Sequence, residues 1–127
     1  MDWHFNNDMP IYTQLISQIK FGIVSGQLPP GERMTAVREL AAEAGVNPNT
    51  MQRALQELER EGLVFTQRSN GRFVTEDVSM IEEAKIALAK QHIEEFLHAM
   101  EALGYNREEI IALLSSGEGE DKDDGNT

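Results

Sequence analysis

A four-residue break between two short amphipathic segments limits what this chain can fold into. Residues 45–48 are Gly-Val-Asn-Pro. Glycine readily adopts the left-handed conformation that ends a helix, asparagine caps the helix that follows, and proline is accepted in a first helical turn. The break therefore predicts two helices joined by the turn "GVN", which is the arrangement of a helix-turn-helix.

The segments on both sides of the break have the apolar spacing of helices that pack on a core. Their apolar residues are Val37, Leu40, Ala41 and Ala44 before the break and Met51, Ala54, Leu55 and Leu58 after it. The second set recurs at i, i+3, i+4 and i+7, and residues 9–25 show a similar repeat that predicts a first helix. The helix after the break carries mainly polar side chains on its outer face, where they can form directed hydrogen bonds.

A change of pattern after Gly62 predicts a β-hairpin. The stretches "LVFTQR" and "RFVT" are rich in β-branched and aromatic residues, and Asn70-Gly71 between them is a strong hairpin signal. Three helices followed by such a hairpin form a winged helix-turn-helix, which we expect over residues 1–78. The fold class is therefore mainly α with a small β wing.

Residues 79–116 are expected to form a C-terminal region of two helices that makes the contact in a homodimer. The first helix carries an apolar seam that a pair of helices cannot bury by itself, and exposed seams of this kind mark interfaces. The seam consists of Ile86, Ile93, Phe96, Leu97, Met100 and Leu103.

Asn106 and Glu109 have the spacing of a capping box at the start of the second helix. Residues 117–127 contain no apolar side chain and are predicted to be a disordered acidic tail.

The charge of the chain is unevenly distributed. A formal net charge of -11 by itself argues against a nucleic-acid partner, because phosphate binding requires lysine and arginine. Through Val78, however, seven Lys and Arg stand against ten Asp and Glu, so most of the acidity follows that residue. The N-terminal part can therefore present a local basic face.

Cysteine content and hydropathy restrict the class of protein. The chain has no cysteine, which excludes disulfides and thiolate sites. Its N-terminus lacks the pattern of a signal peptide, and no stretch approaches the roughly 20 apolar residues that a membrane span requires. We expect a soluble, cytoplasmic protein with no membrane partner.

Three stretches resemble the GntR family of bacterial transcription regulators. They are "PIYTQLISQIKFGIVSGQLPPGERM", "VRELAAEAGVNPNTMQRALQELEREGLV" and "GRFV", and they cover most of residues 9 to 76. The short helical region after the wing, together with "NPNT", is similar to the YtrA subfamily. The resemblance implies a homodimeric repressor that binds a pseudo-palindromic operator in double-stranded DNA, and it suggests control of a transporter operon.

The resemblance also implies which residues lie at DNA. They are Arg38 in the second helix, Asn49, Thr50, Gln52 and Arg53 around the third, and Arg68, Ser69, Asn70, Gly71 and Arg72 in the wing. Arginine can pair with guanine O6 and N7, and glutamine or asparagine with adenine N6 and N7. Other roles stay open for two of them, because Arg53 can pair with Glu57 at i+4 and Gln52 can simply face water.

Two positions depart from the family pattern. Ala36 stands where the family usually has a serine that caps the second helix, and Thr35, one position earlier, is a substitute for it. Loss of such a cap costs about 1 kcal/mol, so we expect the helix to persist on its packing, while the sequence leaves open whether a phosphate contact is made here. Ser69 stands where the wing usually has a glycine, which leaves Gly71 to supply the close approach of the backbone.

An enzyme and a protein-binding module are the competing interpretations. His92 and His98 are six residues apart, about 240° around a helix, so they do not share a face as metal ligands would. We therefore expect no catalytic residue, metal or cofactor. A winged helix can also serve only as a protein–protein interaction module without sequence-specific DNA binding, since a fold does not fix a function. The sequence leaves open the operator, the regulated genes and any small-molecule effector.

Overall fold

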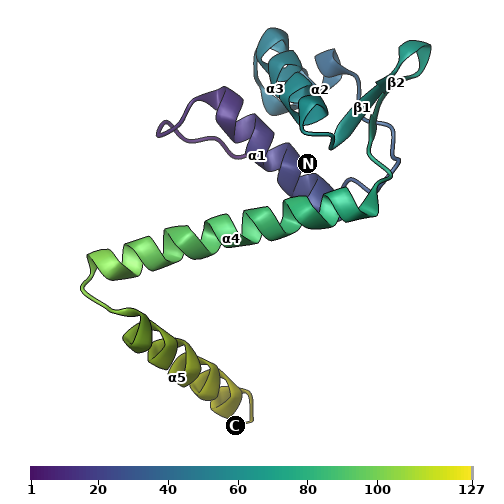
Figure 1. Ribbon diagram of the computed structural model, residues 1–127. Coiled ribbons are helices and arrows are strands. Elements are labelled where there is room, and N and C mark those ends of the chain that lie inside the picture. Colours follow the sequence, from purple (N-terminus) through teal and green to yellow (C-terminus); the bar gives the residue numbers. More distant parts are fainter. Residues whose placement is uncertain (127) are drawn as a thin grey trace. The chain divides into compact units, whose positions relative to one another are not determined.

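Three helices and a hairpin form the first of two structural units. The computed structural model describes the backbone of residues 1–126 and the side chains of residues 1–117. In chain order the elements are α1 (Ile11–Val24), α2 (Val37–Ala44), α3 (Pro48–Arg60), β1 (Val64–Gln67), the 3-10 turn η1 (Arg68–Asn70), β2 (Gly71–Val74), α4 (Val78–Ala102) and α5 (Arg107–Asn126) (Figure 1). The first unit ends at Lys85, within α4, and the second begins at Ile86. The predicted fold class is confirmed.

The core of the first unit lies between α1, α3 and the hairpin. Leu15 and Ile19 of α1 are fully buried, and the four apolar residues predicted for α3 are at most 1% exposed. Helix α2 packs on α3 through Leu40 and Ala41, and Ile81 in the first turns of α4 joins the same core. Burial of the apolar stripe of α3 leaves the other side of that helix facing outward.

The turn between α2 and α3 has the predicted geometry. Gly45 has φ 72°, and the N–H groups of Gly45 and Val46 donate to the carbonyl oxygens of Ala42 and Ala41. This is a Schellman ending, which satisfies carbonyls that the helix itself leaves free. Oδ1 of Asn47 accepts the N–H of Asn49 at 2.7 Å and so caps α3. The helix-turn-helix prediction is confirmed.

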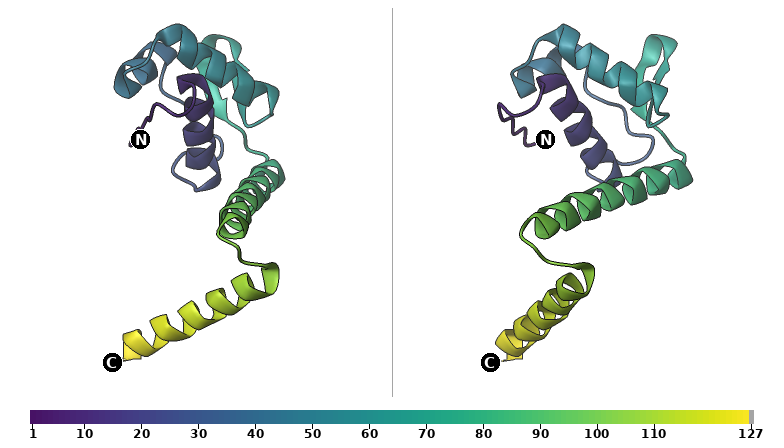
Figure 2. Two further views of the ribbon diagram at one scale, coloured as in Figure 1. Left: turned by 90° about the vertical axis from the view of Figure 1, so that its left-hand side faces the viewer. Right: turned by 60° about the vertical axis from the view of Figure 1, so that its left-hand side comes forward.

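The hairpin is antiparallel, and its register decides which side chains meet the core. Val64 pairs with Val74 and Thr66 with Arg72, so these four side chains share the face that packs toward α3. Phe65 and Phe73, which pair on the other face, stack with their ring centroids 5.7 Å apart. The base of the hairpin packs on α3, and its tip projects beyond the helices, as the right-hand view of Figure 2 shows.

The segment before α2 lies along β2 and widens the wing. The N–H of Met34 donates to the carbonyl of Arg72 at 2.8 Å, and the N–H of Val74 donates to the carbonyl of Glu32 at 2.9 Å. Arg33 forms a β-bridge with Phe73 between these two hydrogen bonds. The sequence patterns predict this connector only as a turn-rich loop, because its pairing partner is some 40 residues away.

The N-terminal segment is held against α1 by two glutamine side chains. The amide of Gln14 exchanges hydrogen bonds with the backbone N–H and C=O of Asn6, and the amide of Gln18 does the same with His4. Gln14 also donates to the carbonyl of Met9 at 2.7 Å. Because Met9 is used in this way and Pro10 is extended, α1 begins at Ile11 and not at residue 9 as the spacing predicts.

The second unit contains the rest of α4 and all of α5. The capping box at α5 is confirmed: Asn106 Oδ1 accepts the N–H of Glu109 at 2.8 Å, and Glu109 Oε1 accepts the N–H of Asn106 at 2.9 Å. Helix α5 continues to Asn126, where the sequence predicts a disordered tail from residue 117. The side chains of residues 118–127 and the backbone of Thr127 lie outside the described residues, and the disorder stays a prediction.

The described helices do not have the properties of membrane spans. Across the described part of the chain, none of them combines the length and the apolar character that a membrane span requires.

The start of α2 generates a testable prediction, because its cap position, Ala36, makes no side-chain hydrogen bond. Ala36→Ser places a hydroxyl at the N-cap with Glu39 at the third helical position, which completes a capping box. We expect the free energy of unfolding to rise by about 1 kcal/mol, measured by urea denaturation.

Ala42→Ser is the matched control, because it makes the same exchange at an exposed position inside α2. It should be neutral or slightly destabilising, since serine is a weaker helix former than alanine. An Ala36→Ser protein no more stable than the parent would contradict a missing cap.

Candidate nucleic-acid interface

The outer face of α3 carries the polar side chains that the sequence assigns to DNA. Asn49 and Arg53 are exposed, whereas Thr50 and Gln52 are half-buried. They lie on the outer side of α3 because the opposite side, formed by Met51, Ala54, Leu55 and Leu58, is buried in the core. The structure therefore brings together on one helix face all four candidates predicted for the third helix.

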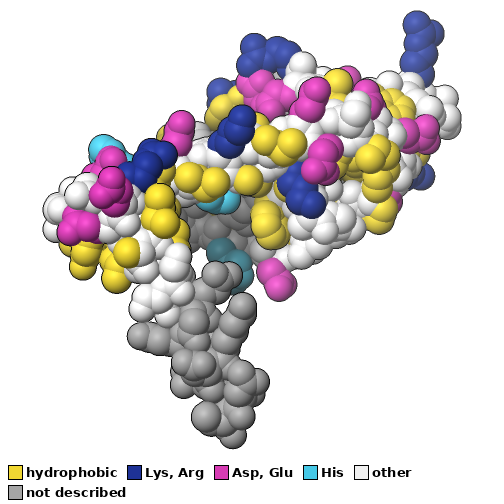
Figure 3. Space-filling view, turned by 60° about the horizontal axis from the view of Figure 1, so that its bottom comes forward, with side chains coloured by type: hydrophobic (Ala, Val, Ile, Leu, Met, Phe, Trp, Pro, Cys, Tyr) yellow, Lys and Arg dark blue, Asp and Glu magenta, His cyan; other side chains and the backbone are white. Residues whose placement is uncertain are grey.

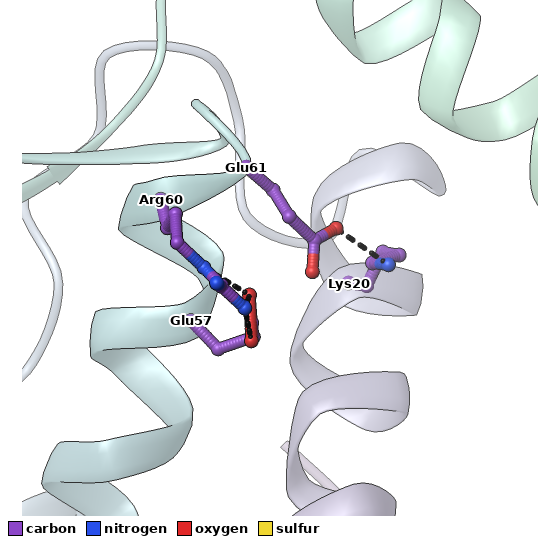
Figure 4. A network of polar contacts seen from close by, with 4 residues as sticks. All are labelled: Lys20, Glu57, Arg60 and Glu61. Atoms are coloured by element: carbon purple, nitrogen blue, oxygen red, sulfur yellow. Dashed lines mark hydrogen bonds and ion pairs between the residues drawn. The ribbon is translucent and has the colours of Figure 1, made fainter.

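Arg53 is held by an aromatic ring and not by a carboxylate. Its guanidinium carbon lies 4.6 Å from the centroid of the Tyr12 ring of α1. Glu57, the alternative partner, instead pairs with Arg60 in the next turn (Figure 4), and this hydrogen bond raises the pKa of Arg60 above its ordinary value. Stacking covers the face of the guanidinium, so its N–H edge stays available for a base or phosphate. The alternative pair between Arg53 and Glu57 is wrong.

Three basic side chains of the first unit are neutralised by carboxylates. Lys20 of α1 pairs with Glu61, just after α3, at 2.8 Å (Figure 4), and Arg60 and Arg72 pair with Glu57 and Glu59. Among the described residues of this unit, no ion pair engages Lys85 of α4 or the four arginines Arg33, Arg38, Arg53 and Arg68. Among the described residues from α1 to β2, the arginines without an ion pair therefore all lie on the connector, α2, α3 and the wing.

The tip of the wing is open and polar. Arg68, Ser69 and Asn70 form the exposed turn, and Gly71 follows with φ 103°. Its positive φ disfavours a side chain here, and a Cβ at this position would lie 3.2 Å from Nε of the exposed Arg33. Gly71 thus lets the connector arginine lie directly against the wing.

Arg33 is a candidate that sequence reasoning missed. It is exposed, makes no ion pair within the described residues and lies beside Gly71. The signal available in the sequence was a single arginine in the connector "GERM", and nothing in that pattern places it near residues 71–73.

A groove separates the start of α2 from the wing. Its walls include Arg33, Thr35 and Ala36 on one side and Thr66, Gly71 and Arg72 on the other. Thr35 does not replace the missing serine, since no described side chain makes a cap hydrogen bond to α2 and its first turn keeps N–H groups without a side-chain acceptor. Such N–H groups favour an anion, although Glu39 also lines the groove and weakens that preference.

Arg72 is the wing candidate that the structure places differently. Its Nη1 donates to Oε1 of Gln52 at 3.3 Å, and its Nε donates to Oε1 of Glu59 at 3.4 Å. The same Glu59 oxygen accepts the hydroxyl of Thr66 at 2.8 Å. Gln52 therefore does not simply face water, and Arg72 is directed toward α3 and not toward the tip.

The comparison with protein families decides the identity of this fold. The family described as "Bacterial regulatory proteins, gntR family" matches residues 11–74, which run from α1 to the end of β2. This chain belongs to the GntR family.

Relatives of known name extend the match beyond the winged helix. The uncharacterised HTH-type transcriptional regulator YhcF of Bacillus subtilis is 40% identical over 111 residues, which cover 87% of this chain and 92% of that protein. The HTH-type transcriptional repressor YtrA of the same organism is 37% identical over 89 residues, or 69% of this chain and 68% of that protein. The resemblance to YtrA-like regulators is confirmed.

Solved structures agree with these relatives. A GntR family transcriptional regulator from Listeria monocytogenes superimposes with a TM-score of 0.81 at 41% identity, covering 88% of this chain and 98% of that one. The AraR DNA-binding domain in complex with operator ORX1 superimposes with a TM-score of 0.54 at 25% identity, covering 59% of this chain and 96% of that one. The chain is a GntR-type transcriptional regulator with a winged helix-turn-helix.

Proposed function

We propose that this GntR-family protein is a repressor that binds a pseudo-palindromic operator as a homodimer in the bacterial cytoplasm. The observation that carries the proposal is the outward polar face of α3, together with Arg33, Arg38, Arg53 and Arg68, for which the described residues offer no ion pair. The name of its relative YtrA as a repressor, and the operator complex of the AraR domain, support it. Control of a transporter operon is our inference from the YtrA-like resemblance.

In this proposal α3 enters the major groove and reads bases, while its surroundings bind the backbone. Gln52 and Arg53 face base edges, and Asn49 and Thr50 lie at the helix N-terminus, where phosphate is favoured. Arg38 binds phosphate. The wing residues Arg68 to Gly71 approach the minor groove or its phosphates. Arg33 adds a phosphate contact beside the wing.

The proposed homodimer forms through the second unit. Several residues of the predicted seam are exposed in the single chain: Ile86 at 47%, Ile93 at 55%, Phe96 at 41% and Leu103 at 73%. Ile111, Leu113 and Leu114 of α5 are exposed as well, and hydrophobic side chains are visible on the surface in Figure 3. An apolar surface of this extent favours a second copy as its cover. Two-fold symmetry then requires two half-sites in the operator, and a dimer over a promoter blocks polymerase.

Two substitutions separate base reading from phosphate binding. Gln52→Ala should relax the base preference at one symmetric operator position, costing roughly 1–3 kcal/mol against the correct base. Arg38→Ala should instead weaken binding to all sequences and make the salt slope of log K shallower by about one. Selection from random DNA, followed by titrations at several salt concentrations, measures both effects.

The same titrations distinguish a protein-binding module from a DNA-binding protein. A module that binds only proteins shows no salt-sensitive affinity for random DNA at low salt. Full retention of affinity and sequence preference by both Gln52→Ala and Arg53→Ala would show that α3 is not the reading helix. Circular dichroism and sedimentation establish first that each variant is folded and keeps the oligomeric state of the parent.

The dimer is tested by placing a charge in the exposed seam. Phe96→Glu should convert the dimer to monomers at micromolar concentration, because a carboxylate buried in an apolar interface without a partner is strongly unfavourable. Operator binding should weaken with it, since one copy binds only one half-site.

Gln91→Glu is the control, because it adds the same charge at an exposed position of α4, about 140° around the helix from Phe96. It should leave the sedimentation coefficient unchanged. A parent protein that sediments only as a monomer would rule out the homodimer.

A further inference from the structure

The register of the wing directs Arg72 toward the reading helix and away from solvent. Arg72 stands opposite Thr66. Two pairs along the hairpin, on the same face, Val64 stands opposite Val74, and both valines are buried in the core. Its side chain is 16% exposed, so it lies along the protein for most of its length. Arg68, at the wing tip, is exposed and makes no ion pair among the described residues. The two wing arginines therefore have different surroundings.

The charge of Arg72 is already matched within the protein. Oε1 of Glu59 lies 3.4 Å from its Nε, and the Thr66 hydroxyl donates to the same oxygen at 2.8 Å and holds the carboxylate in place. A cation paired in this way attracts a DNA phosphate less than a free one does. Arg72 thus connects the wing to α3. Phosphate charge is instead neutralised by the arginines that have no ion pair within the described residues.

The remaining hydrogen bond of Arg72 fixes the orientation of a proposed base-reading residue. A guanidinium has donors only, so the group of Gln52 that faces Nη1 at 3.3 Å has to be the amide oxygen. The amide nitrogen, which carries both N–H donors, is then the end of the Gln52 amide that Arg72 does not engage. Donors of this kind match the N7 and O6 acceptors of guanine, whereas bidentate pairing with adenine needs the oxygen as well.

We infer that Arg72 is a positioning residue that sets operator preference by turning the amide donors of Gln52 toward the major groove, where they select guanine. The inference rests on the proposed reading of an operator by α3. It assigns specificity to a wing residue that does not itself contact DNA, and it replaces the expectation that Arg72 is one of the wing's DNA contacts.

The test is a selection from random DNA with the full-length parent and the variants Gln52→Ala, Arg72→Lys, Arg72→Ala and Arg68→Ala. Gln52→Ala identifies the operator position that depends on Gln52, where we expect guanine in the parent. Lysine at 72 keeps the charge but has one nitrogen, which cannot bond Glu59 and Gln52 with the geometry of the guanidinium fork. Arg72→Lys should therefore lose most of the preference at that position, a loss of roughly 5- to 150-fold, while the salt slope stays unchanged.

Arg68→Ala is the matched control in the same wing. It should lower affinity for all sequences and reduce the salt slope by about one, with base preference preserved. In a Gln52→Ala background, Arg72→Lys should cause no further change at the Gln52 position. If Arg72→Ala lowers the melting temperature, its loss of base preference has two possible causes. Arg72→Lys then decides the test, because lysine at this position can still pair with Glu59.

The outcomes separate this inference from the proposed function. Loss of preference in Gln52→Ala but full retention in both Arg72 variants would overturn the positioning role and leave the proposed function intact. Adenine at the Gln52-dependent position of the parent would overturn the outward orientation of the donors. A parent without salt-sensitive DNA binding would overturn the proposed function itself, and the inference with it.

Discussion

Burial of the apolar stripe of α3 against α1 is the contact on which the other features of the first unit depend. Met51, Leu55 and Leu58 are removed from water together with Leu15 and Ile19, which fixes the rotation of α3 about its axis. A helix fixed in this way has only one face left to present. Tyr12 of α1 then lies under Arg53, and the hairpin packs on α3 at the level of Glu59. One hydrophobic contact thus positions the aromatic platform, the wing and the polar face.

Selective pairing of charges makes an acidic chain compatible with DNA. The chain carries a formal net charge of -11, and even its winged helix has more carboxylates than basic residues through Val78. Glu57, Glu59 and Glu61, however, each pair with a basic side chain, which belongs to α3, to the wing and to α1 respectively. Their pairing leaves the unpaired arginines on the connector, α2, α3 and the wing tip. Local distribution, and not net charge, therefore governs how such a surface meets phosphate.

Local sequence signals predicted much of the fold and fewer of the contacts. Gly45 and Asn47 act within one helical turn of their own positions, so the helix-turn-helix and the cap of α3 follow directly from their chemistry. The same holds for Asn106 and Glu109 at α5. The start of α1 was placed too early because Met9 is held by Gln14, and the pairing of the connector with β2 was missed. Both contacts join segments that no local pattern relates.

The sequence by itself determined the order of elements, the buried face of each helix and the residue types offered on the other faces. Those properties depend on helical periodicity, on turn chemistry and on the exclusion of apolar side chains from water, all of which act over a few residues. Only the tertiary structure decided which partner each polar side chain contacts. Arg53 stacks on Tyr12, Arg33 lies beside Gly71, and Arg72 bonds Gln52 and Glu59. The physical reason is that hydrogen bonds and ion pairs act over a few ångströms, so a polar side chain finds its partner only after packing has brought distant segments together.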